Sequence, residues 1–169
     1  MEGVGKTDSY MAGLKAHSPE QEMVIAEFLP KMMVTMQSLG VDRDFIFVLS
    51  PYNERNGFKD WGLMRRDYTV KPAFAAFATL TDKLGNATLL GSRELGPGLR
   101  GFVYRQPDGS GTLVYWSLSE IDTEKWLPAV NLKDSKAKKF SLPLEGKFTG
   151  VDAFGTPFTV QSANHRLEL

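Results

Sequence analysis

Two features near the start of the chain could do chemistry. Gly5-Lys6-Thr7 has the ending of a phosphate-binding loop, and Glu2 places a carboxylate just before it. A phosphate-binding loop also needs an earlier glycine and a buried strand, because its backbone N–H groups must converge on the phosphates. The residues before Gly5 supply neither feature. The pattern therefore favours a glycine-rich loop over a nucleotide site, and Glu2 becomes the more interesting residue.

Composition excludes several other classes of protein. The chain has 169 residues, with 20 basic and 20 acidic side chains and no cysteine. A net charge near zero argues against nucleic acid or an anionic membrane as the main partner. No run of 18 apolar residues could span a membrane. The two histidines, His17 and His165, lack the spacing of metal ligands, so we expect no metal site.

The first predicted helix covers residues 18–39. Ser18 is a suitable N-cap, and Gln21 is its partner in a capping box. Apolar residues then recur every three or four positions, and Gly40 is a typical helix stop. Pro30 interrupts the stripe and should kink the helix, because it lacks an N–H group.

A strand, a loop and a second helix are predicted next. Phe45–Leu49 is continuously apolar, which is typical of a strand buried on both faces of a parallel sheet. Residues 50–60 form a polar and aromatic loop. The second helix begins with Pro72 and runs to Leu84, where Gly85 ends it. The order of helix, buried strand, loop and helix indicates part of a βα-repeat sheet.

From residue 86 the hydrophobic period changes to two. Many short strands with Gly, Pro and Asp turns between them predict an antiparallel sandwich or barrel. The expected strands lie near 87–94, 99–105, 111–117, 127–132, 137–142, 148–152, 156–161 and 165–169.

The order of these pieces resembles the end of a clan-A glycoside hydrolase. The phrases that carry the resemblance are GVDRDFIFVLSPY, WGLMRRDYTVKPAFAAFATLTDKLG, LVYWS and VDAFGTPF, and it covers roughly residues 18–160. Members of that clan are (β/α)8 barrels, and many carry a C-terminal β-sandwich. The resemblance implies an α+β fragment. Residues 1–85 would be the last helix–strand–helix of the barrel, and residues 86–169 an antiparallel β-sandwich domain.

The same resemblance implies a partner and a substrate. A whole barrel takes about 250 residues, so the partner would be the missing N-terminal barrel segment, which holds the general acid/base. The substrate would be a carbohydrate, and no cofactor is implied. In that family the nucleophile is a Glu at the end of the seventh strand. Glu2, followed by Gly3 and sixteen residues ahead of Ser18, matches that place. The alternative is an exposed Glu without a role.

Substrate-binding residues are expected in the loop after the Phe45–Leu49 strand. Tyr52 and Trp61 could stack on a sugar, because aromatic rings present an apolar face to its C–H groups. Asn53 and Glu54 could form hydrogen bonds with its hydroxyl groups. For Trp61 the neighbouring Gly62-Leu63 favours the alternative, which is packing of the loop against the last helix.

The leading hypothesis is therefore the C-terminal part of a glycoside hydrolase. Such an enzyme would cleave O-glycosidic bonds with two carboxylates by a retaining mechanism, but only when the whole barrel is present. The chain alone is expected to be inactive. The alternative is a non-catalytic module, either carbohydrate-binding or structural, built on the β-sandwich.

Overall fold

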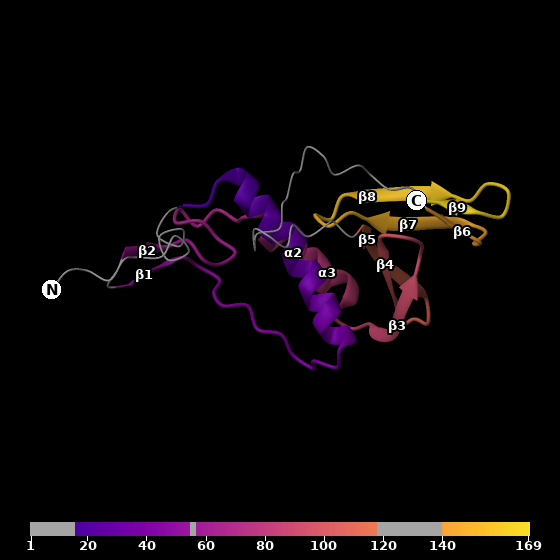
Figure 1. The fold of residues 1–169 in the computed structure, drawn as a ribbon, viewed down its shortest axis with the longest axis horizontal. Helices are drawn as coiled ribbons and strands as arrows, with labels where there is room; N and C mark the ends of the chain where they lie inside the picture. Colours follow the sequence, from indigo (N-terminus) through magenta and orange to yellow (C-terminus); the bar gives the residue numbers. More distant parts are fainter. Residues whose placement is uncertain (1–15, 55–56, 118–139) are drawn as a thin grey trace.

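The computed structural model describes residues 16–54, 57–117 and 140–169. These residues form a mixed α+β fold of two helices and several antiparallel sheets (Figure 1). The elements in chain order are α2 (Pro19–Ser38), β1 (Tyr52–Glu54), β2 (Gly57–Lys59), α3 (Pro72–Leu84), β3 (Thr88–Glu94), β4 (Leu99–Arg105), β5 (Gly111–Ser117), β6 (Ser141–Leu142), β7 (Lys147–Val151), β8 (Pro157–Gln161) and β9 (Leu167–Glu168). Neither helix is long and apolar enough to cross a membrane.

Helix α2 begins as the sequence predicts. The Ser18 side chain accepts a hydrogen bond from the Gln21 backbone N–H at 3.3 Å, and the Gln21 side chain accepts one from the Ser18 N–H at 2.9 Å. This reciprocal pair satisfies two N–H groups that would otherwise lack partners at the helix start. Pro30 lies inside the helix, which continues without a break to Ser38.

The end of α2 is also as predicted. Gly40 has φ +87°, a left-handed conformation that glycine adopts without a steric penalty. The Gly40 N–H donates to the Gln37 carbonyl, and the Val41 N–H donates to the Met36 carbonyl, both at 3.1 Å. These two bonds form a Schellman motif, which satisfies carbonyls of the last turn. Helix α3 matches its predicted bounds, from Pro72 to Leu84.

Phe45–Leu49 does not form the predicted buried strand in the described structure. This segment is extended, and its side chains alternate between an inner and an outer face. Ile46 packs against the helices, whereas Phe45 and Phe47 are 87% and 71% exposed. A strand needs a neighbour to accept and donate its backbone hydrogen bonds. No strand among the described residues pairs with this segment, so it remains a connection between α2 and β1.

The following loop contains a hairpin that the sequence did not predict. Strand β1 pairs with β2 in antiparallel register, with Tyr52 opposite Lys59 and Glu54 opposite Gly57. Figure 1 places this hairpin at one end of the molecule and the other sheets at the opposite end, with the helices between them.

The β-rich half follows the predicted spacing. Strands β3, β4 and β5 form a three-stranded antiparallel sheet, while β7 pairs with β8 and β6 pairs with β9. Phe102 in the central strand lies opposite Ser92 of β3 and Val114 of β5. The expected strand at 127–132 lies outside the described residues, as does the first part of 137–142.

Two hydrophobic clusters hold the helices and the sheet together. The first joins α2, the 60–71 segment and α3, and its buried members are Ala26, Leu29, Leu63 and Ala73. The second joins both helices to β4, and its buried members are Val34, Leu84, Phe102 and Tyr104. The Tyr104 hydroxyl also donates to the Gln37 side chain of α2 at 2.9 Å. The second cluster is therefore the one that packs the helices against the sheet.

Candidate functional site

Three aromatic side chains form a row beside the β1–β2 hairpin. The ring centroids of Phe47 and Tyr52 are 5.9 Å apart, and those of Tyr52 and Trp61 are 6.2 Å apart, both in edge-to-face geometry. Trp61 is 43% exposed, so part of its indole faces solvent. Such rings offer an apolar surface with a polar group at its edge, which suits contact with a sugar.

A tight turn at Gly62 holds Trp61 in this row. Gly62 has φ +108°, and a Cβ added there would lie 2.5 Å from the carbonyl oxygen of Val48. Only glycine allows this close approach of the two backbones. The N–H groups of Leu63 and Met64 then donate to the Leu49 carbonyl at 3.0 Å. The turn therefore joins the 60–71 segment to the end of the extended segment.

The residue before Trp61, Asp60, forms a buried ion pair. The Lys71 ammonium is 3.0 Å from the Asp60 carboxylate, and it also donates to the Asp60 backbone carbonyl at 3.0 Å. Both residues are buried, and Lys71 is only 1% exposed. Removing two charges from water is costly, and only close pairing with further hydrogen bonds offsets that cost. This pair ties the residue before Trp61 to the start of α3.

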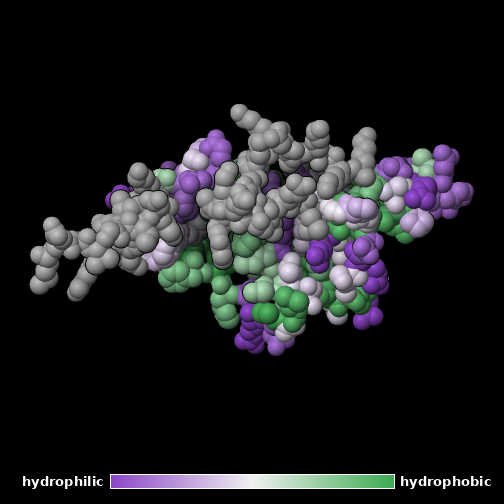
Figure 2. Space-filling model, in the orientation of Figure 1, coloured by the Kyte–Doolittle hydropathy of each residue, from purple (hydrophilic) through white to green (hydrophobic). Residues whose placement is uncertain are grey.

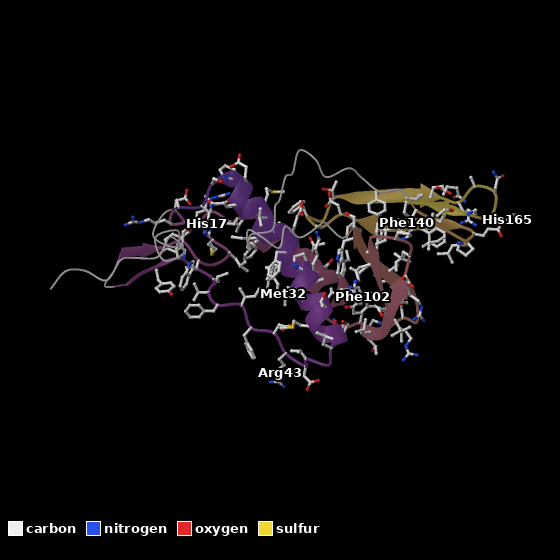
Figure 3. The ribbon with its side chains drawn as sticks, viewed as in Figure 1. His17, Met32, Arg43, Phe102, Phe140 and His165 are labelled. Carbon is white, nitrogen blue, oxygen red and sulfur yellow. The ribbon has the colours of Figure 1, made fainter. Side chains whose placement is uncertain are left out.

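His17 completes the cluster from the other side. Its backbone N–H donates to the second carboxylate oxygen of Asp60 at 2.6 Å. Its ring Nδ1 is buried, has no hydrogen-bond partner in the part of the chain that the structure describes, and lies 3.7 Å from the same oxygen. Burial, together with the nearby Lys71 charge, lowers the pKa of His17 below its usual 6.5. Figure 3 shows His17 near the start of α2, at the hairpin end of the molecule.

A second ion pair fixes the rest of the 60–71 segment. The Arg65 guanidinium binds both carboxylate oxygens of the buried Glu22 in α2. Another nitrogen of Arg65 donates to the Val70 carbonyl at 2.8 Å. Bidentate pairing of this kind is geometrically specific. It holds the 65–70 loop against α2.

The structure brings together two of the five predicted site residues. Tyr52 and Trp61 lie in contact, although they are nine positions apart in the sequence. The backbones of Asn53 and Glu54 belong to β1, but their side chains lie outside what is described. Glu2 also lies outside the described residues, so its role as nucleophile remains a prediction.

Sequence reasoning missed the buried cluster of His17, Asp60 and Lys71. One signal could have indicated it. Lys71 occupies the N-cap position of α3, where Ser, Thr, Asp or Asn is preferred. A lysine there makes no cap hydrogen bond and needs another role.

A cavity of about 170 Å³ lies away from this cluster. It is bordered by the C-terminal halves of the two helices and by the 41–44 segment, and its lining includes Met33, Leu80, Asp42 and Asp44. It shares no lining residue with the aromatic row. We therefore place the candidate site at the row.

Comparison with known proteins identifies a similar fold. No family model and no curated protein matches the sequence. Among solved structures, the chain is similar to part of a family 39 glycoside hydrolase from the gut symbiont Bacteroides cellulosilyticus WH2. The TM-score is 0.58 and the identity 17%, covering 88% of this chain and 28% of that chain. The chain thus spans little more than a quarter of that protein, and the likeness shows a shared fold.

Proposed function

We propose that this chain is the C-terminal portion of a glycoside hydrolase that cleaves O-glycosidic bonds. The observation that carries the proposal is the structural likeness, which extends over 88% of the chain. It agrees with a resemblance found independently in the order of the sequence phrases. In this proposal residues 1–85 complete a barrel, and residues 86–169 form the β-sandwich attached to it.

The outer face of the extended segment supports this proposal. Phe45, Phe47 and Leu49 are all exposed on it. Figure 2 shows hydrophobic groups along the lower edge of the molecule, where Figure 1 places the connection between α2 and β1. Exposed apolar groups in such a row normally mark a surface that a partner covers. Parallel strands on either side of residues 45–49 would cover it and pair with its backbone.

The proposed mechanism uses two carboxylates. Glu2 would attack the anomeric carbon and form a glycosyl ester, and a carboxylic acid from the missing barrel segment would protonate the departing oxygen. That second group would then act as a base toward the water that hydrolyses the ester. Tyr52 and Trp61 would bind the sugar by stacking. No cofactor enters this scheme.

The first test is an activity assay on the purified chain. We expect no turnover of a panel of nitrophenyl glycosides, because general acid catalysis alone contributes about 10²–10⁴-fold and its source is absent. Rapid turnover by the 169-residue chain would contradict the proposal.

The second test is the DNA upstream of Met1. An open reading frame that encodes six further βα units would support the enzyme, and an in-frame stop behind a ribosome site would oppose it. In the extended protein, Glu2→Gln should abolish turnover while leaving sugar binding, and Glu20→Gln serves as a control on an exposed carboxylate of α2.

A non-catalytic carbohydrate-binding module is the second candidate. The partly exposed Tyr52–Trp61 pair favours it, because stacking needs no carboxylate. Titration with oligosaccharides should then change the tryptophan fluorescence of the chain alone, and Trp61→Ala should remove the change. Absence of binding by the chain alone would exclude this second candidate.

A further inference from the structure

Asp60 connects three parts of the chain that are distant in sequence. One carboxylate oxygen accepts from the His17 backbone, the other lies 3.0 Å from the Lys71 ammonium, and the backbone carbonyl accepts from Lys71 as well. We call His17, Asp60 and Lys71 the Asp60 junction. The separations along the chain are 43 residues from Asp60 to His17 and 11 to Lys71. The junction therefore joins the approach to α2, the approach to Trp61 and the start of α3.

The Nδ1 atom of His17 lacks a hydrogen-bond partner among the described residues. It is buried beside the Asp60 carboxylate. Among the described residues, the charged groups that face it are Asp60, Lys71 and Glu22. Lys71 already neutralises Asp60, and Arg65 already neutralises Glu22. A proton added to His17 would therefore leave the buried junction with an excess positive charge.

The junction lies next to the candidate sugar-binding surface. Asp60 immediately precedes Trp61, and the Gly62 turn fixes the backbone on the other side of that indole. Trp61 in turn contacts the edge of Tyr52. A protonated Nδ1 would become a donor toward the carboxylate oxygen 3.7 Å away, in competition with the His17 backbone N–H. One peptide bond joins Asp60 to Trp61. Any movement of Asp60 toward the His17 ring would therefore displace Trp61.

We propose that the Asp60 junction is a proton-sensitive positioning device for the Tyr52–Trp61 pair, with His17 as its titrating group. Neutral His17 leaves Asp60 bound to Lys71 and holds Trp61 in the aromatic row. Protonated His17 draws the carboxylate toward its ring and changes the orientation of Trp61. The link to sugar binding rests on the function proposed above, whereas the coupling between His17 and Trp61 does not.

The pH at which the device works follows from its surroundings. Burial and the Lys71 charge lower the pKa of His17, and Asp60 and Glu22 oppose them only in part. The junction is therefore in its neutral form at neutral pH, and the change occurs on acidification below pH 6.5.

The experiment is an NMR titration of the whole chain from about pH 8 to about pH 5, across the range of histidine. The indole N–H signal of Trp61, assigned with Trp61→Phe, is followed together with the two histidine rings. We expect the Trp61 signal to shift with the midpoint of His17, below pH 6.5. His165 is a suitable internal control, because it is exposed and lies at the opposite end of the molecule (Figure 3).

Two variants decide the result. His17→Gln keeps the backbone N–H bond to Asp60 and removes only the titrating ring, so the Trp61 shift should disappear. His165→Gln should leave it unchanged. A Trp61 signal that does not follow His17, or that still shifts in His17→Gln, would overturn the proposal, as would unfolding before His17 titrates. Because no sugar is present, such a failure would leave the glycoside hydrolase proposal intact.

Lys71→Arg tests the charge in the junction. It keeps the positive charge beside Asp60, so the coupled shift of Trp61 should persist. If the shift is lost while the circular dichroism spectrum is unchanged, a positive charge beside Asp60 is not enough to maintain the coupling, and the proposal fails.

Discussion

Strand β4 and the 45–49 segment are both extended and rich in apolar residues, but their environments are opposite. In β4, Phe102 is 2% exposed and packs beneath the two helices, and the strand has a hydrogen-bonded neighbour on each side. In the 45–49 segment, only the inner face packs against the helices. The two stretches differ in their neighbours, and the more apolar of the two is the more exposed. An apolar run can therefore be buried, but it is buried only when a second element packs against it.

Hydrogen exchange should show the largest difference between the two regions. From Phe45 to Val48 no backbone N–H donates a hydrogen bond to another described residue, whereas β4 is bonded on both sides. Amides of β4 should exchange only through global opening, and those of 45–48 almost freely. Equal protection of both regions in a monomer would contradict the proposal that this chain is part of a larger barrel.

Truncation of one phenylalanine in each region should give the next largest effect. Phe102→Ala removes a buried ring and should lower the free energy of unfolding by about 3–5 kcal/mol. Phe45→Ala removes an exposed ring and should change it by less than about 0.5 kcal/mol. Urea denaturation measures both. A large cost for Phe45→Ala would mean that this side chain is packed in solution.

The Gly62 turn is where the extended segment is held most closely. Gly62→Ala should destabilise the chain by about 2–4 kcal/mol, because the new Cβ meets the Val48 carbonyl in a left-handed conformation. Gly109→Ala is the matched control. Gly109 has φ +86° but nothing within 4 Å of the added Cβ, so only about 1–2 kcal/mol should be lost. Equal losses would show that the close approach at Gly62 does not contribute.

The inner face of the extended segment packs on α2. Weakening the start of that helix should destabilise the chain less than Gly62→Ala does. Ser18→Ala breaks the capping box and should cost about 1 kcal/mol in thermal or urea unfolding. Ser38→Ala, at the other end of α2, should change stability by less than about 0.5 kcal/mol. A neutral Ser18→Ala would mean that the cap is not formed in solution.

The smallest effect should come from acidification. The pKa of His17 is lower in the folded chain than in the unfolded chain, so the unfolded chain takes up its proton more readily. The contribution of His17 to stability is therefore present above pH 6.5 and is lost as the pH falls through the folded value. His17→Gln should reduce the slope of stability against pH in this window.

Much of the local structure could be predicted from short-range patterns. Ser18 and Gln21 cap α2 from three residues apart, and Pro72 and Gly85 mark the start and end of α3. The strands of the β-rich half follow from period-two alternation and turn residues. Tyr52 and Trp61 were predicted by type, and the structure places them together. The prediction for Glu2 rests on resemblance and stays a prediction.

The sequence by itself determined both helices and the strands of the β-rich half, because capping, turn conformation and alternation act between residues a few positions apart. Only the tertiary structure decided three other features. It left residues 45–49 without a strand neighbour, it formed the β1–β2 hairpin inside a predicted loop, and it joined His17, Asp60 and Lys71. Each depends on contacts whose strength comes from exclusion of water or from a partner strand. For residues 45–49 and for the Asp60 junction, no local pattern encodes which distant segment will provide the partner, whereas the two strands of the hairpin are neighbours in the sequence.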